Sequence, residues 1–419
     1  MKELVHIIQA PPFWLKSPAL GPFYLKKYLE KKGVSAEIID LNNTIFQLLP
    51  YSKNQWLTLN EEFEKTLFFI AEEKLPVIFN DFFERIKDTE FIAFSIFKRN
   101  MHFSFLLAEK IKEKFPSKKI IFGGPQTLLL DKENNLNPQY KWVIGEGEIP
   151  LHKIVQNKTD SIYRFQEIED LDQIPFIDFE GVNLSNYSWC IPLISSRGCL
   201  YKCNFCSEKN LYRKFRCHCP QYMRDQIKYL IKKHKITRFI FTDSMINHSN
   251  EWLTEFCNLL ITGGLKIQWE AQMRIKKKVP LSLAKLLEAS GCYNLFIGLE
   301  SGSNKTLQNM NKGFTADDAL DFFKTLYAAN LHFEVSLILG YPQESEEDFR
   351  QTLAFIVKNK KVIPKIAQIN PFIDYLGNYG DNNLGGKQAT KRLFTMINTL
   401  NSEKIRYTKG FINNLIYQK

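Results

Sequence analysis

Three cysteines stand close together near the middle of the chain, at Cys199, Cys203 and Cys206. Their spacing, C-x3-C-x2-C, lets three thiolates reach one inorganic centre from a single loop. Three thiolates can bind three irons of a [4Fe–4S] cluster and leave the fourth iron without a protein ligand. That open iron can chelate a small molecule and transfer an electron into it.

The distribution of the cysteines favours a metal centre over a disulfide framework. All eight lie at or after Cys190, and six fall between Cys190 and Cys219. A small secreted protein would instead spread its cysteines along a short chain. Zinc is the alternative metal, because a structural zinc site takes four ligands. The fourth zinc ligand could come from Cys190, Cys217, His218 or Cys219.

Composition limits the class of protein. The chain has 419 residues, of which 44% are hydrophobic and 24% charged, which excludes a wholly disordered, collagen-like or coiled-coil chain. No apolar run reaches about 18 residues and the N-terminus lacks a signal-peptide pattern, so we expect a cytoplasmic protein without a membrane span. The net charge is +11, but the longest basic run is only Lys276–Lys278, so we expect no nucleic-acid partner.

The first part of the chain alternates between strand and helix patterns, which indicates a parallel sheet with helical crossovers. In such sheets, ligands bind beyond the carboxyl ends of the strands. Loops with proline, basic or glycine residues follow four of the expected strands there. The strands are expected at 4–9, 34–40, 91–96, 119–122 and 142–144, and the helices at 21–33, 44–88 and 102–115.

The second part begins at the cysteines and repeats a strand–helix unit six times, as a partial barrel of parallel strands would require. Chemistry in such barrels lies at the carboxyl ends of the strands. Strands are expected at 191–195, 238–242, 267–273, 294–299, 332–339 and 365–370, with helices at 221–233, 250–262, 281–289, 316–329 and 346–358.

The cysteine motif, with an aromatic residue just before its last cysteine and a strand in front, resembles that of the radical S-adenosylmethionine (SAM) superfamily. Later segments resemble this superfamily too: 241–244, 269–274, 298–303 with 310–313, and 339–344. The resemblance implies a [4Fe–4S] cluster on the three cysteines. Arg274 is expected to pair with the SAM carboxylate, since guanidinium and carboxylate form charge-assisted hydrogen bonds. The expected SAM-binding residues are Phe205, Ser244, Gln272, Arg274, Glu300 and Gly340.

The first part resembles the cobalamin-binding domain that precedes many radical SAM barrels. It departs from classical cobalamin modules in lacking the Asp-x-His-x-x-Gly motif that places a histidine beneath cobalt, and His6 is expected to be a satisfied core residue. Many radical SAM relatives bind cobalamin without that histidine. The residues expected to bind cobalamin are Pro11, Pro12, Gly21, Ser95, Lys98, Arg99, Gly123, Gly124, Pro125, Gly145, Glu146 and Glu148.

Together these patterns predict an α/β chain with a Rossmann-like parallel-sheet cobalamin-binding domain followed by a partial (β/α)6 radical SAM barrel. The expected divisions are 1–158 for the first domain, 159–187 for a linker, 188–375 for the barrel and 376–419 for a C-terminal cap or tail.

The resemblance implies a cobalamin-dependent methyltransferase. A radical formed from SAM would abstract hydrogen from an unactivated carbon, and methylcobalamin would then supply the methyl group. No catalytic residue is assigned beyond the cofactors. The expected partners are an electron donor such as flavodoxin or ferredoxin, and a peptide or small-molecule metabolite as substrate.

Three alternatives stay open. The first is another radical SAM reaction, such as ring formation or rearrangement, with or without cobalamin. The second is methylthiolation of RNA, which the absence of cysteines from the first domain disfavours. The third is a zinc-stabilised binding module without catalysis.

Overall fold

The computed structural model describes residues 4–57, 61–157, 160–187, 190–374 and 387–408. These residues divide into two compact units. The first contains the chain up to Pro192 together with Asn210–Arg216, and the second contains Leu193–Lys209 and the chain from Cys217 onward. Each unit is built around its own six-stranded sheet.

The first sheet has the strand order β2-β1-β3-β4-β5-β6, and its paired strands run parallel. Because the order doubles back at β1, the crossover helices lie on both faces of the sheet. This confirms the predicted Rossmann-like fold. The strands are β1 (Leu4–Gln9), β2 (Ser35–Asp40), β3 (Phe91–Ser95), β4 (Lys119–Gly123), β5 (Lys141–Ile144) and β6 (Ile162–Arg164).

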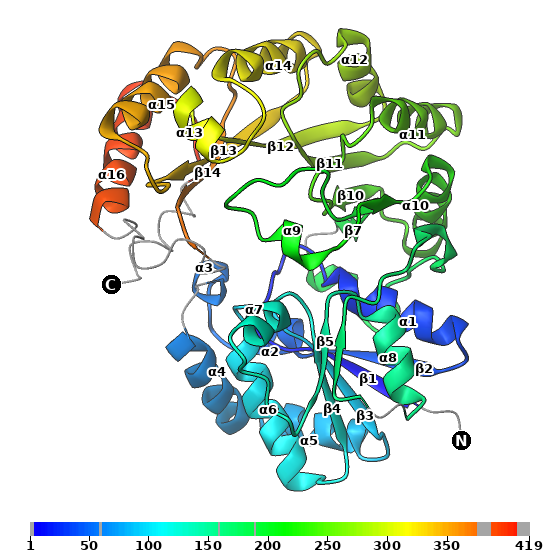
Figure 1. Cartoon of the computed structure of the whole chain (residues 1–419). Coiled ribbons are helices and arrows are strands. Elements are labelled where there is room, and N and C mark those ends of the chain that lie inside the picture. The colour runs from blue at the N-terminus through cyan, green and yellow to red at the C-terminus, as the bar shows by residue number, and fades with distance from the viewer. Residues whose placement is uncertain (1–3, 58–60, 158–159, 188–189, 375–386, 409–419) are drawn as a thin grey trace. The chain divides into compact units, whose positions relative to one another are not determined.

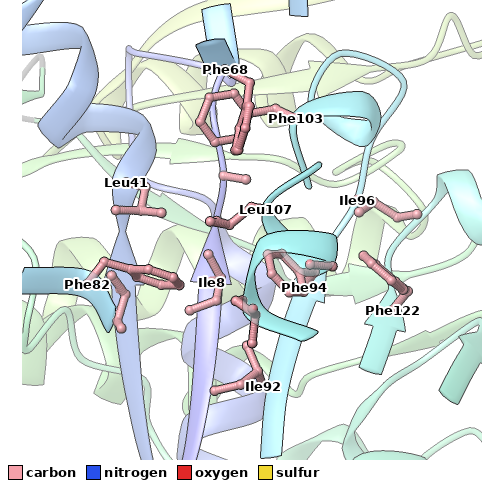
Figure 2. Close-up of a cluster of buried hydrophobic side chains, with 14 of the residues drawn as sticks. Ile8, Leu41, Phe68, Phe82, Ile92, Phe94, Ile96, Phe103, Leu107 and Phe122 are labelled. Carbon is pink, nitrogen blue, oxygen red and sulfur yellow. The ribbon is translucent and has the colours of Figure 1, made fainter. Parts of the chain in front are cut away.

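Alternate residues along these strands face opposite sides, which gives the first unit its main core. Ile8, Phe94 and Phe122 face the side covered by Phe68, Phe82 and Phe103 from the crossover helices (Figure 2). The helices are α1 (Leu20–Lys31), α2 (Leu41–Leu48), α3 (Lys53–Trp56), α4 (Glu61–Lys74), α5 (Pro76–Ile86), α6 (Met101–Lys114), α7 (Gln126–Lys132) and α8 (Glu148–Val155).

Two expectations for the first unit have clear outcomes. The helical stretch expected over 44–88 is divided among α2–α5, and Pro76 occupies the first turn of α5. His6 is a satisfied core residue, as predicted. It is 1% exposed, and its two ring nitrogens lie 2.8 Å from Thr89 Oγ1 and 3.3 Å from Glu37 Oε2.

The segment after α8 is mostly irregular, but it supplies the outermost strand of the first sheet. Residues 162–164, which sequence patterns place in a linker, form β6 beside β5. Two short 3-10 helices follow at Leu171–Gln173 and Leu184–Asn186. Ile174, Ile177 and Phe179 are buried, so this stretch packs onto the protein rather than extending into solvent.

The second sheet has the strand order β14-β13-β12-β11-β10-β7, so each strand lies beside its neighbour in the sequence. The pairs from β10 to β14 are parallel, which matches the predicted partial barrel. The strands are β7 (Ile191–Leu193), β10 (Arg238–Phe241), β11 (Gln268–Met273), β12 (Cys292–Glu300), β13 (Phe333–Leu339) and β14 (Ile366–Pro371). Short strands β8 (Ser196–Arg197) and β9 (Arg216–Cys217) lie near the cysteines.

Helices follow one another along the outer side of the second sheet (Figure 1). Side chains cap several of them, as at Ser249 before α11 and at the capping boxes that Thr315 and Ser345 start before α14 and α15. The helices are α9 (Glu208–Leu211), α10 (Pro220–His234), α11 (Asn250–Thr262), α12 (Leu281–Ala289), α13 (Asn304–Asn309), α14 (Ala316–Ala328), α15 (Glu346–Lys358) and α16 (Lys387–Ser402). No helix of the described residues is long and apolar enough to cross a bilayer.

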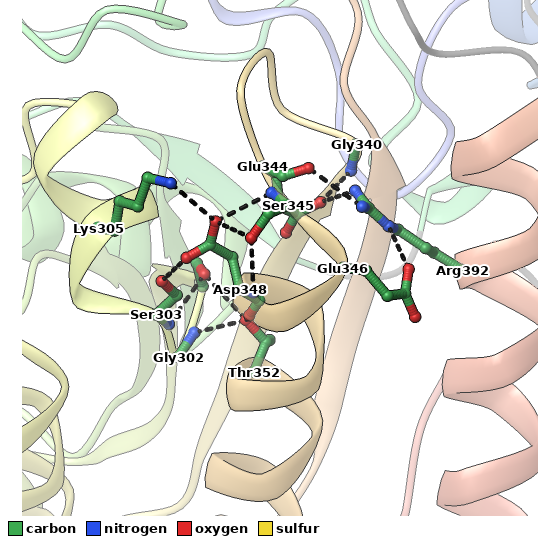
Figure 3. Close-up of polar contacts among 11 residues, drawn as sticks. Gly302, Ser303, Lys305, Gly340, Glu344, Ser345, Glu346, Asp348, Thr352 and Arg392 are labelled. Carbon is green, nitrogen blue, oxygen red and sulfur yellow. Dashed lines mark hydrogen bonds and ion pairs between the residues drawn. The ribbon is translucent and has the colours of Figure 1, made fainter.

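Helix α16 belongs to the segment 376–419 that was expected to be a cap or tail, of which residues 387–408 are described. A buried ion pair ties it to the loop after β13. Arg392 Nη1 lies 2.6 Å from Glu344 Oε2, and that same oxygen accepts a hydrogen bond of 2.7 Å from Gly340 N (Figure 3). Arg392 thus anchors α16 to the carboxyl end of β13.

Candidate active site

The three motif cysteines lie on one loop, residues 199–206, called here the cysteine loop. It follows the first strand of the second sheet, as the sequence patterns predict. All three thiols are free; Cys203 is buried, and Cys199 and Cys206 are half-buried. Burial raises the pKa of Cys199, and it raises the pKa of Cys206 to about 11, because a thiolate loses hydration there.

Hydrogen bonds from backbone and side-chain donors hold the cysteine loop against the segment 309–312, at the end of α13. Asn204 donates from its backbone N to Met310 O at 3.0 Å and from its side chain to Asn309 O at 2.7 Å. Asn311 donates from its side chain to Lys202 O at 3.0 Å. The positions of the cysteines are therefore set by a segment more than a hundred residues further along the chain.

Arg274 follows β11 and reaches the cysteine loop. Its Nη1 lies 3.2 Å from Cys203 Sγ, its Nη2 donates to Lys312 O, and its guanidinium carbon lies 3.7 Å from the centre of the Tyr201 ring. Asn247 fixes the backbone of Arg274 through bonds to both its N and its O. The residue expected to meet a SAM carboxylate is thus placed directly against the sulfur of Cys203, one of the three expected cluster ligands.

Glu300, at the end of β12, forms a buried polar group with two residues that sequence patterns did not single out. Its carboxylate lies 3.2 Å from Lys312 Nζ and accepts a hydrogen bond of 3.0 Å from Ser336 Oγ. A Cβ at Gly298 would collide with this carboxylate, so a larger residue there would require the Glu300 side chain to shift. The backbone of Glu300 has a φ of +70°, an uncommon value for a residue with a side chain.

Phe205 lies on the cysteine loop itself, and Ser244 lies near it. Lys312 Nζ lies 5.6 Å from the centre of the Phe205 ring, which brings that ring beside the Glu300–Lys312 pair. Ser244 donates a hydrogen bond of 2.7 Å to Glu208, just after the cysteine loop. The pKa of Glu208 is raised by burial, although the bond from Ser244 opposes the shift.

The two remaining residues of the expected SAM set lie at other strand ends. Gln272 is exposed near the end of β11, and its carbonyl accepts from Ile246 N at 2.9 Å. Gly340 follows β13 and donates its N–H to Glu344. Gly340 is next to Tyr341, which forms a small core with Met310 and Phe372, and Phe205 of the cysteine loop packs against that core.

Sequence reasoning missed several residues that shape this site. Asn311 and Lys312 lie within the segment 310–313 that resembles the superfamily, but neither was given a role. Asn204 looked like an ordinary loop residue. Met245 Sδ lies 3.8 Å from Cys199 Sγ. Asp243, fully buried, accepts hydrogen bonds from Ser195 and Ser196 in front of the cysteine loop. The position of Asp243 at a strand end was the one available signal for it.

In the first unit, the loops after β1, β3 and β4 are joined at the carboxyl edge of the sheet. Asn100 is fully buried and donates from its side chain to Ala10 O at 3.1 Å and to Ser95 O at 3.2 Å. Gly124 has a φ of +100°, and a Cβ there would lie 2.6 Å from Ile96 O. Asn100, which had no assigned role, thus holds together loops to which cobalamin binding was assigned.

The residues expected to bind cobalamin differ in how open they are. Lys98, Gly21 and Pro125 are exposed, whereas Pro11, Pro12 and Glu148 are buried. Ser95, Arg99, Gly123, Gly124 and Gly145 are half-buried.

Glu146 is buried and already paired. Its carboxylate lies 2.5 Å from Arg216 Nη2 and accepts a hydrogen bond of 3.1 Å from Ile168 N. The side chain of Glu146 therefore ties the loop after β5 to Arg216 and to the backbone at Ile168.

The donor set fits a cluster better than a single zinc ion. Among the described residues, no group of three or more histidine, cysteine, aspartate or glutamate side chains converges as ligands of one ion would. The sulfurs that bind a [4Fe–4S] cluster can lie further apart than the ligands of one ion, because each cysteine binds a different iron. Two of the four candidate fourth zinc ligands have other contacts: Cys219 Sγ accepts from Tyr222 N as the N-cap of α10, and His218 stacks on Tyr222 at 4.1 Å.

Comparison with known proteins supports the same reading. Residues 193–356 match the family described as the radical SAM superfamily. The bacteriochlorophyllide d C-12(1)-methyltransferase of Chlorobaculum tepidum is 25% identical over 277 residues, covering 62% of this chain and 59% of that protein. An anaerobic magnesium-protoporphyrin IX monomethyl ester cyclase of Cereibacter sphaeroides is 28% identical over 195 residues, covering 44% of this chain and 32% of the cyclase.

Among solved structures, the cobalamin-dependent SAM radical enzyme OxsB, with aqua-cobalamin and SAM bound, has a TM-score of 0.69. The match covers 98% of this chain and 57% of OxsB at 16% identity. At that identity the likeness establishes a shared fold across both units. The chain spans roughly a third to three-fifths of the length of these proteins.

Proposed function

We propose that this chain, whose residues 193–356 match the radical SAM superfamily, is a radical SAM enzyme and a cobalamin-dependent methyltransferase acting on an unactivated carbon. When bound, the cluster with SAM would supply a hydrogen-abstracting radical, and methylcobalamin would supply the methyl group. The protein contributes binding, orientation and exclusion of water.

The observation that carries this proposal is the placement of three free thiols, Cys199, Cys203 and Cys206, on one loop at the carboxyl end of a parallel strand. These thiols supply three ligands, so one iron of a four-iron cluster stays open to a small molecule. The bonds from Asn204 and Asn311 to their partners keep the loop in place.

Around this loop, each of the proposed SAM-binding residues would contact a different part of the SAM molecule. Phe205 offers an aromatic face, and Glu300 is a carboxylate that could accept from an ammonium group. Ser244, Gln272 and Gly340 lie at the ends of neighbouring strands, where parallel barrels bind their ligands. Arg274, the sixth residue of the expected set, already contacts Cys203 and Lys312, and its role is taken up below.

Cobalamin is proposed to lie at the carboxyl edge of the first sheet. The fold shared with a cobalamin-dependent enzyme supports this placement, as does the cradle at Gly124, where a Cβ would fill space beside Ile96. His6 and His102 are the two histidines before residue 150, and His6 is held in the core by Thr89 and Glu37. We therefore propose cobalamin without a histidine ligand from this domain.

The decisive experiment is anaerobic purification followed by iron, sulfide and cobalamin analysis. Cys199→Ala, Cys203→Ala and Cys206→Ala are each expected to remove the cluster and SAM cleavage. Cys219→Ser is the matched control, because serine is a preferred N-cap and preserves the start of α10. Iron retained in Cys219→Ser supports the proposal; an iron-free, zinc-containing wild-type protein contradicts it.

Ring formation is the second candidate reaction, because an anaerobic magnesium-protoporphyrin IX monomethyl ester cyclase is among the relatives of this chain. The mass of the product separates the two reactions. Methylation adds one CH2, whereas ring closure between carbons removes hydrogen. Methylthiolation of RNA is disfavoured, because no cysteine precedes Cys190 to hold a second cluster in the first unit.

The proposed setting is the cytoplasm, where its eight free thiols would stay reduced. The proposed electron donor is a low-potential carrier such as flavodoxin or ferredoxin. The proposed substrate is a peptide or a small-molecule metabolite. Incubation of the loaded enzyme with labelled SAM and candidate substrates tests this last point.

A further inference from the structure

Arg274 is a buried cation that contacts one of the three cysteines proposed to bind the cluster. The residue is 9% exposed, and no carboxylate of the described residues forms an ion pair with it. Its Nη1 lies 3.2 Å from Cys203 Sγ. A buried charge without an opposite charge is costly, so the Cys203 sulfur, which would carry negative charge as an iron ligand, is the group that this guanidinium is placed to meet.

The remaining contacts of Arg274 fix its direction. Nη2 donates to Lys312 O, the Tyr201 ring covers one face of the guanidinium at 3.7 Å, and Asn247 holds the backbone from both sides. A planar guanidinium held by the Lys312 carbonyl and the Tyr201 ring, on a fixed backbone, keeps its donors in one orientation. Arg274 is therefore set to donate to the sulfur before any ligand arrives.

We propose that Arg274 is a positioning residue of the iron–sulfur centre, which acts through Cys203 to favour the reduced cluster. This inference rests on the proposed function. Hydrogen bonds to the sulfurs are one of the factors that set cluster potentials. Reduction adds one electron, supplied by an external one-electron donor, and so adds one negative charge beside the guanidinium. Arg274 stays protonated throughout, and no bond to it forms or breaks.

This role differs from the carboxylate contact that the sequence resemblance implies for the same residue. If Arg274 acts by contacting SAM, its substitution lowers the affinity for SAM and leaves the cluster unchanged when SAM is absent. A contact to Cys203 alters the cluster itself, with or without SAM. The two roles therefore separate in a measurement made without SAM.

The test is a redox titration of the anaerobically reconstituted full chain without SAM, followed by electron paramagnetic resonance. Arg274→Gln is expected to lower the ratio of reduced to oxidised cluster at a fixed solution potential by at least about tenfold, as expected for loss of a hydrogen bond to a charged group. Arg274→Lys keeps the charge without the planar fork and is expected to fall between Arg274→Gln and the wild type.

Arg238→Gln is the matched control. Arg238 lies on β10 of the same sheet, with its guanidinium 5.5 Å from the centre of the Tyr293 ring, and it has no contact with the cysteine loop. Its substitution is expected to leave the titration unchanged. SAM affinity of each variant is measured separately by equilibrium dialysis.

The outcomes are distinguishable. A wild-type protein that cannot hold iron overturns the proposed function. A wild-type cluster with an unchanged titration in Arg274→Gln, with SAM affinity lost or not, overturns the role of Arg274. If Arg274→Gln holds no iron, Arg274→Lys decides: a shifted titration supports the inference, and a wild-type titration overturns it.

Discussion

Breaking the buried ion pair between Arg392 and Glu344, drawn in Figure 3, should loosen helix α16. The side chains of Glu344 and Arg392 are 0% and 3% exposed, and Arg392 Nη2 also donates to Glu344 O at 3.1 Å. Arg392→Met leaves a buried carboxylate without its cation, although the bond from Gly340 N to Glu344 remains. Loss of one partner of a buried pair costs about 3–5 kcal/mol, and we expect a destabilisation of that size.

This cost should depend on pH. Burial raises the pKa of Glu344, and Arg392 is among the groups that hold it down. In Arg392→Met, the pKa of Glu344 rises further, so the carboxyl group becomes neutral more readily as the pH falls. The destabilisation should therefore be smaller at pH 5 than at pH 8.

Urea unfolding of the full chain, combined with hydrogen exchange of the α16 amides, measures this effect. The Glu344→Gln/Arg392→Met double variant should recover part of the loss, because it leaves no buried charge. Arg350→Met is the control. Arg350 is 70% exposed in its pair with Glu346, and its loss should cost less than about 1 kcal/mol. Strictly additive costs for the two buried substitutions would refute the reasoning.

Three further predictions concern the first unit. Burial raises the pKa of Glu64 to about 8 from 4.5, so the folded state prefers the neutral acid and loses stability as the pH rises through that interval. Glu64→Gln should match the wild type near pH 4 and exceed it by roughly 4 kcal/mol at pH 8 in urea titrations; a constant difference would disprove this. Gly124→Ala, at a φ of +100°, should cost at least about 1–3 kcal/mol, whereas Gly21→Ala, which meets no atom within 4 Å, should cost nothing measurable in the same thermal melts. The buried Lys118 donates to Ile86 O, Lys87 O and Thr89 O, so Lys118→Met should cost about 3 kcal/mol; an unchanged melting temperature would show that water replaces the ammonium.

Much of the fold was readable because its signals are local. The helices at 250–262, 281–289 and 346–358 begin and end where sequence patterns placed them, since Ser249, Pro280 and Ser345 mark their starts. The strands of both sheets are short apolar runs between such helices. Strand β6 could not be predicted, because three residues carry no periodicity and it exists only by pairing with β5.

The candidate site was readable only in part. The spacing of the cysteines identified the loop, but the partners of that loop come from distant segments. Nothing local to Asn100, Lys312 or Asn204 indicates what each side chain contacts, because the contacts depend on how strands and loops meet in three dimensions. Arg274 is the clearest example. Its position at a strand end was recognised, but its contact with Cys203 depends on how two distant segments meet in the folded protein.

The bonds that tie residues 199–206 to the segment 309–312 also bear on how the centre is assembled. Ordering a chain segment costs about 1–2 kcal/mol for each residue. Here Asn204, Asn311 and Arg274 hold the cysteine loop with contacts that involve no metal. Much of that entropy is thus lost when the polypeptide folds, so an assembly factor could deliver iron and sulfide to a finished apoprotein. The apoprotein should accordingly survive repeated loading and stripping without refolding.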